Sequence, residues 1–222
     1  ENRHWGSGQF FDLAQLAVKL AVKNQIEIRI VDLAQAYLNL GNTAWNRSEP
    51  TVAFETLQKS QRLFRSIGVV GKACFAEAVM ANLHSQKGEF ESAFSLIFHI
   101  LDEVKDQQED EVEGLANLSA GSFHFDLESY KEALNYFLQS LECFSRINDE
   151  VGVARATNNA GMSLHKLGRN DEGLEYCERS LEIYTKLAMD QGRAKSKRDI
   201  GKILEGQGKL EEALACFQSS LE

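Results

Sequence analysis

The chain has 222 residues, 43% of them hydrophobic and only one of them proline, and its formal net charge is −9 at pH 7. Scarce proline favours long uninterrupted helices over a β-sandwich or barrel, and no run approaches the roughly 20 apolar residues that a membrane-spanning helix needs. The negative charge argues against a nucleic-acid partner, because a phosphate-binding surface needs basic residues.

The predicted elements are amphipathic helices that recur in pairs with a period of 40 residues. Small and apolar residues recur at spacings of three and four, and each period holds two such stretches, as at 151–166 and 171–186. Turn signals separate them, and in the first turn Ser48 is expected to cap the next helix while Pro50 begins it. In chain order we expect a partial repeat over 1–30, full repeats over 31–70, 71–110, 111–150 and 151–190, and a truncated repeat over 191–222.

Small residues occupy the same three positions in every row when the sequence is written in rows of 40. The three columns are Gly41, Ala81, Gly121, Gly161, Gly201; Ala53, Ala93, Ala133, Gly173, Ala213; and Ala36, Ala76, Ala116, Ala156, Ser196. Apolar columns lie between them, such as Leu57, Ile97, Phe137, Cys177, Phe217, and Phe64, Val104, Phe144, Tyr184. Small residues let two crossing helices approach closely, and large ones fill the grooves beside the crossing.

This pattern resembles the tetratricopeptide repeat (TPR). The glycine column, the alanine column of the second helix, the Leu167-Gly168 turn and the aromatic residues Phe90 and Tyr130 carry the resemblance. It implies an all-α fold, a right-handed α-solenoid of antiparallel helix pairs. The period of 40 departs from the common 34, and the usual proline after the second helix is missing. Such longer repeats are similar to those of spindle-orientation adaptors, kinesin light chains and bacterial peptide-pheromone receptors.

The resemblance covers essentially the whole chain, so residues 1–222 are expected to form a single TPR solenoid. Residues 8–25 align with the second helix of a repeat whose first helix is mostly missing, and no polar capping element ends the sequence. We therefore expect a piece of a larger protein. Its oligomeric state stays open, because apolar residues at its ends, such as Leu13, Leu20 and Phe217, could pair two copies.

The four cysteines predict buried, reduced thiols and a cytoplasmic protein. Cys74, Cys143, Cys177 and Cys216 lie at least 34 residues apart and form no CxxC pair. This spacing excludes a zinc knuckle and argues against a framework of disulfide bonds.

No catalytic or metal-binding arrangement emerges from the sequence. His84 and His124 share one column, but adjacent repeats place them roughly 10 Å apart, too far to ligate one metal. Gly68–Ala73 lacks the glycine spacing of a phosphate loop, and the acidic run 102–113 is typical of a solvated surface. Sequence order offers no Ser-His-Asp or Cys-His arrangement. We therefore expect a protein that is not an enzyme and that has no metal or cofactor.

The resemblance implies a partner-binding concave groove lined by the first helix of each repeat. Carried over row by row, the predicted groove residues are Asn39, Asn42, Trp45, Phe75, Asn82, Phe125, Arg155, Asn158, Asn159, Lys195, Arg198 and Lys202. Asparagines can bind a peptide backbone, aromatic residues supply pockets, and basic residues favour acidic ligand groups. The alternative reading, that the aromatic residues pack between repeats and the charges are solvated, stays open. Some TPR domains clamp the terminal carboxylate of chaperone tails with lysine, asparagine and arginine side chains. This sequence does not match that clamp, because Leu118 stands at the position of a clamp lysine and Asp199 at the position of the clamp arginine.

Two functions fit these observations. The first is a non-catalytic protein–protein interaction module that binds a peptide or helix of another protein, with a bound segment that is partly apolar and partly acidic. The alternative is a peptide- or ligand-sensing regulatory domain of a larger signalling protein, such as a bacterial one. Neither function involves nucleic acid or membrane insertion.

Overall fold

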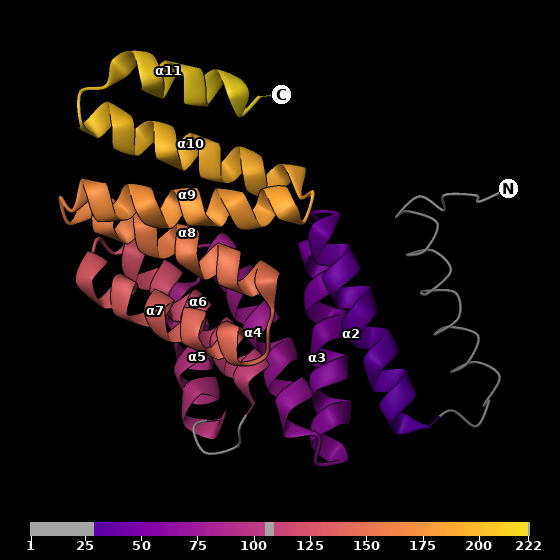
Figure 1. Cartoon of the computed structure of the whole chain (residues 1–222). Coiled ribbons are helices and arrows are strands. Elements are labelled where there is room, and N and C mark those ends of the chain that lie inside the picture. Colours follow the sequence, from indigo (N-terminus) through magenta and orange to yellow (C-terminus); the bar gives the residue numbers. More distant parts are fainter. Residues whose placement is uncertain (1–28, 105–108, 222) are drawn as a thin grey trace, which may run out of the picture. The chain divides into compact units, whose positions relative to one another are not determined.

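The computed structural model describes residues 29–104 and 109–221 (Figure 1), which form ten helices and no strand. The helices are α2 (Ile30–Asn46), α3 (Pro50–Ser66), α4 (Val70–Gln86), α5 (Phe90–Val104), α6 (Asp110–Asp126), α7 (Tyr130–Arg146), α8 (Glu150–Lys166), α9 (Asn170–Lys186), α10 (Asp190–Gly206) and α11 (Leu210–Ser219). The all-α prediction is confirmed for these residues. The helix expected over 8–25 lies outside them.

The predicted helix pairs are confirmed, and their register is regular. First helices begin at residues 30, 70, 110, 150 and 190, and second helices at 50, 90, 130, 170 and 210. Helices α2–α5 form one compact unit and α6–α11 another. We call them the N-terminal unit (29–104) and the C-terminal unit (109–221). That the two units belong to one continuous solenoid stays a prediction.

Each described turn places a residue of left-handed backbone directly after the helix C-cap. These residues are Ser48, Gly68, Gly88, Glu128, Asn148, Gly168, Ala188 and Gly208, with φ between 53° and 79°. At the first turn, the amide of Glu49 donates to Ala44 O at 2.9 Å and that of Ser48 to Trp45 O at 2.9 Å, which is the Schellman pattern. The prediction that Ser48 caps α3 is therefore wrong: Ser48 terminates α2, and α3 has Glu49 at its N-cap with no side-chain cap. Pro50 begins α3 as predicted.

Replacing Ala188 with glycine is expected to stabilise the protein by about 1 kcal/mol. Ala188 is exposed with φ 53°, and left-handed backbone costs a residue with a Cβ about 1–2 kcal/mol. The same change at Ala215, an exposed residue within α11, should instead cost about 1 kcal/mol through lost helix propensity. Urea denaturation of both variants measures the difference, and an equal loss at both positions would contradict the reading of the turn.

Two of the three small-residue columns, that of Gly41 and that of Ala53, lie where the two helices of a pair cross, as predicted. A Cβ added to Gly41 would lie 2.6 Å from Leu57 Cγ, one on Gly121 would lie 2.6 Å from the Phe137 ring, and one on Gly201 would lie 2.6 Å from the Phe217 ring. Each glycine thus faces the large residue of the predicted apolar column. The alanine column is buried throughout, with Ala53, Ala93, Ala133 and Ala213 at most 2% exposed.

A buried serine ties the two helices of three repeats together, a feature the sequence analysis did not identify. The hydroxyls of Ser60, Ser140 and Ser180 donate to the carbonyls of Ala34, Gly114 and Ala154, each at 2.8 Å. All three serines are fully buried. In the α4–α5 pair the equivalent position is Ile100, also fully buried, so this pair packs without the serine bond.

Candidate functional site

The first helices form the inner layer of the C-terminal unit. Helices α6 and α8 contact each other, as do α8 and α10, whereas within this described unit α7 and α9 contact only first helices. The first helices approach one another more closely than the second helices do, as expected for a unit that curves toward the side of its first helices. The predicted groove residues of this unit all lie on these three helices.

A pocket of about 230 Å³ opens on this inner layer. It is lined by Ser122, Phe125, Asp126, Phe137, Asn159, Met162, Lys195, Arg198, Asp199 and Lys202. Five of the predicted groove residues thus come together: Phe125, Asn159, Lys195, Arg198 and Lys202. Arg155 is exposed on α8 but does not line the pocket.

A buried carboxylate organises the cationic side of this pocket. Asp199 is 4% exposed and accepts from Asn158 Nδ2 at 2.8 Å and from Lys202 Nζ at 3.0 Å. Lys195 Nζ lies 3.9 Å from Asp199 Oδ2, the oxygen that accepts from Asn158, and donates to Asn159 Oδ1 at 2.8 Å. Burial lowers the pKa of Lys195, although the charge of Asp199 opposes the shift.

Asn158 therefore has a different position from the one predicted. It was expected to face a ligand, but its side chain is fully buried between α8 and α10 and donates to Asp199. Its Oδ1 atom is buried without a hydrogen-bond partner. The residue holds the carboxylate that in turn positions the lysines.

Arg198 is the cation best placed to meet a ligand. It is exposed at the pocket and makes no hydrogen bond or ion pair with the described residues. Phe125 and Met162 supply an apolar surface beside it, and Phe125 also packs against two core clusters of the unit. The pocket can therefore accept an acidic group and an apolar side chain at the same time.

The predicted groove residues of the N-terminal unit differ in their exposure and contacts. Trp45 and Phe75 are half-buried against the core of this unit, and Asn42 Oδ1 is buried without a hydrogen-bond partner. Asn39 is exposed and accepts from Gln35 Nε2 at 3.0 Å, and Asn82 is half-buried.

A larger pocket of about 550 Å³ in this unit lies among α3, α4 and α5. It is lined by Phe54, Gln58, Gln61, Glu77, Met80, His84, Glu91, Ser92, Ser95 and Leu96. None of these residues was predicted, because the expectation placed binding residues on the inner side of the first helices. Most of the lining instead comes from the second helices α3 and α5.

The tetratricopeptide repeat family matches residues 152–222, and the same 40-residue helix pair occupies the rest of the described chain. Residues 152–222 carry the tetratricopeptide repeat, and the rest of the described chain shares its fold. A comparison with curated proteins found no match. The TPR assignment accounts for the small-residue columns and the paired helices together.

Solved structures share this TPR fold at low sequence identity. BtubC from P. vanneervenii is 16% identical, with a TM-score of 0.73 over 97% of this chain and 90% of that one. A Rap conjugation gene regulator of plasmid pLS20, in complex with the Phr* peptide, is 15% identical, with a TM-score of 0.76 over 97% and 68%. A Podospora anserina protein assigned as a kinesin light chain, with nearly identical TPR-like repeats, is 11% identical, with a TM-score of 0.64 over 87% and 95%.

The cysteines of these repeats are free thiols. Cys74, Cys143 and Cys177 are buried and Cys216 is half-buried. Burial raises the pKa of Cys74 and of Cys177 to about 12 and that of Cys143 to about 11. Free thiols of this kind are protonated at neutral pH and are poor nucleophiles.

Two clusters among the described residues gather potential metal ligands. Cys74, Glu77 and Glu103 form one, and Asp110, Glu113 and Cys143 form the other. The second is more open, and Asp110 in it is paired with Arg146 at 2.7 Å. Within the described helices, none is long and apolar enough to cross a membrane.

Proposed function

We propose that this chain is a non-catalytic peptide-binding module, and that the pocket on α6, α8 and α10 receives a segment of another protein. The observation that carries the proposal is the exposed Arg198 beside Phe125 and Met162, in a pocket also flanked by Lys195 and Lys202. A segment that fits this surface has an acidic side chain or a terminal carboxylate next to a large apolar residue.

The rest of the pocket supports a peptide ligand. Asn159 can donate and accept hydrogen bonds at once, as a peptide backbone requires. Three cationic side chains face two carboxylates there, within a chain whose net charge is −9. The pLS20 regulator, which has the same fold, is known in complex with a peptide.

Replacing Arg198 with alanine tests the proposal. An array of peptides that combine acidic and apolar residues first identifies a ligand, and fluorescence anisotropy then measures its Kd. Because Arg198 is exposed, the melting temperature should stay unchanged, while loss of a central charged contact weakens binding by about 30-fold. Lys209→Ala, the loss of an exposed cation between α10 and α11, is the matched control. Equal affinity in the two variants, or no binding at all, would sink the proposal.

A second candidate is a sensor of free peptides, favoured by the regulator in complex with Phr*. A sensor of free peptides would bind a short peptide by itself, whereas the module proposed above would also bind the same residues within a longer chain. Comparing a free peptide with its terminally blocked form, and with the same sequence inside a loop of a folded carrier, separates the two. Equal affinity for all three forms rejects the sensor.

A further inference from the structure

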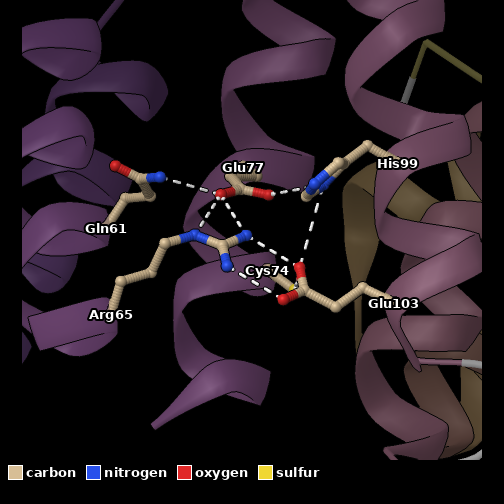
Figure 2. A network of polar contacts seen from close by, with 6 residues as sticks. All are labelled: Gln61, Arg65, Cys74, Glu77, His99 and Glu103. Atoms are coloured by element: carbon tan, nitrogen blue, oxygen red, sulfur yellow. Dashed lines mark hydrogen bonds and ion pairs between the residues drawn. The ribbon is translucent and has the colours of Figure 1, made fainter. Parts of the chain in front are cut away.

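Six polar residues meet in the N-terminal unit, away from the proposed peptide pocket (Figure 2). Gln61 and Arg65 come from α3, Cys74 and Glu77 from α4, and His99 and Glu103 from α5. Glu77 is only 3% exposed, and Arg65 approaches the two carboxylates from the side opposite His99. The cluster thus combines a buried carboxylate, a second carboxylate, a thiol and an imidazole.

The hydrogen bonds of Glu77 all fall on one of its two oxygens. Arg65 Nε and Nη2 donate to Oε1 at 3.0 and 2.8 Å, and Gln61 Nε2 donates to Oε1 at 2.9 Å. The other oxygen, Oε2, is buried with no hydrogen-bond partner. A buried carboxylate oxygen normally has a partner, so this atom is available to a ligand.

The atoms that face Oε2 are suitable metal ligands. His99 Nδ1 lies 3.7 Å from Glu77 Oε2 and 3.8 Å from Glu103 Oε2. Cys74 Sγ lies 3.3 Å from Glu103 Oε2, and one ligand atom from each of Cys74, Glu77 and Glu103 lies within 4.8 Å of the others. The four donors come from two adjacent helices, α4 and α5.

We propose that Cys74, Glu77, His99 and Glu103 form a binding site for a divalent transition-metal ion of the zinc class. Zinc binds thiolate, imidazole and carboxylate ligands in a tetrahedron with bonds of about 2.0–2.3 Å, which separates neighbouring ligand atoms by about 3.3–3.8 Å. Three of the six separations among these donors, 3.3, 3.7 and 3.8 Å, lie in that range. The ligand atoms of Cys74, Glu77 and Glu103 all lie within 4.8 Å of one another, and His99 must rotate toward them to complete the site.

Arg65 fits this site as a partner of the ligands. It holds Glu77 through Oε1 and leaves Oε2 free for the metal, and it donates to both oxygens of Glu103 at 2.9 and 2.7 Å. Such outer hydrogen bonds orient ligating carboxylates. Metal binding breaks the S–H bond of Cys74 and releases its proton to solvent. The three negative charges of the Cys74 thiolate and the two carboxylates then balance the three positive charges of the divalent ion and the Arg65 guanidinium.

Packing of the repeat does not require these ligands. Other repeats have Ala34, Gly114 and Ala154 at the position of Cys74. At the position of Glu103 they have Leu63, Cys143 and Ile183. The solenoid therefore packs with small or mainly apolar residues at these positions, and the cluster is an addition specific to the α4–α5 pair.

Titration with a metal ion alone tests the proposal on the 222-residue chain after treatment with a chelator. One equivalent of Zn²⁺ is expected to bind and to raise the melting temperature, because binding to the folded state alone stabilises it. One equivalent of Co²⁺ is expected to produce the near-ultraviolet charge-transfer absorption of a thiolate–cobalt bond. Absence of stoichiometric Zn²⁺ binding, or a cobalt complex without that absorption, would overturn the site and leave a purely structural ion pair.

Two variants and a control assign the ligands. Cys74→Ser is expected to abolish the charge-transfer absorption, while Cys216→Ser, at a half-buried cysteine of the C-terminal unit, should retain it. His99→Ala is expected to weaken Zn²⁺ binding at least about tenfold, and it should fold normally because the His99 side chain is 59% exposed. Equal charge-transfer absorption in Cys74→Ser and Cys216→Ser would show that Cys74 is not the thiolate ligand. Unchanged Zn²⁺ affinity in His99→Ala would show that His99 is not a ligand.

Discussion

Replacing Arg65 with alanine is expected to lower the free energy of unfolding of the N-terminal unit by about 3 kcal/mol. Arg65 holds the nearly inaccessible Glu77 through two hydrogen bonds and Glu103 through two more. Its guanidinium is also the largest cause of the pKa of Glu103 falling to about 2. Removing one partner of a buried ion pair leaves an uncompensated charge and typically costs about 3–5 kcal/mol. Because the Arg65 side chain is 31% exposed, the expected loss of stability lies at the lower end of this range.

Urea denaturation followed by circular dichroism measures this loss in the chain freed of metal. Arg62→Ala is the matched control, since Arg62 lies on the same helix and is exposed. It should change stability by less than about 0.5 kcal/mol. Equal midpoints for the two arginine variants would show that the ion pair contributes nothing measurable.

Gly161→Ala is expected to destabilise the C-terminal unit by about 2 kcal/mol. An added Cβ would lie 2.7 Å from Cys177 Sγ and 2.8 Å from the carbonyl oxygen of Gly173. The carbonyl belongs to the backbone of α9 and cannot rotate away, so the two helices must separate. Overpacking of this kind costs about 1–3 kcal/mol or more, and it exceeds the roughly 1 kcal/mol that alanine contributes through helix propensity.

Gly206→Ala is the control for this prediction. At Gly206 the nearest atom to an added Cβ is His165 Cε1, at 2.8 Å, the far end of a side chain that can move. Alanine is therefore expected to leave stability unchanged or raise it. Matching urea midpoints for the Gly161 and Gly206 variants would mean that the α8–α9 crossing tolerates a Cβ.

The helix pairs were predictable because packing selects residue types at fixed positions, and the small columns therefore survive while identities change. Five of the predicted groove residues line one pocket for the same reason: they share the inner positions of successive first helices. Whether a partner binds there stays a prediction. The burial of Asn158 was not predictable, because it depends on the carboxylate of Asp199, 41 residues away on α10.

The Glu77 cluster was not predictable from motif spacing. Cys74 and Glu103 lie 29 residues apart, on different helices, and the other repeats have small or mainly apolar residues at these two positions. Reasoning from repeat columns finds what all repeats share, and it overlooks residues that only one repeat carries. A search for polar residues at positions that are apolar in the other rows would have drawn attention to Glu103.

The serine-to-carbonyl bonds described above have a consequence for how the chain folds. Each spans 26 residues, and the bond from Asn158 to Asp199 spans 41. A fold held by such local contacts closes only short loops, so its contact order is low and its formation is rapid. Folding can then begin in any helix pair and propagate to its neighbours, as in a one-dimensional array.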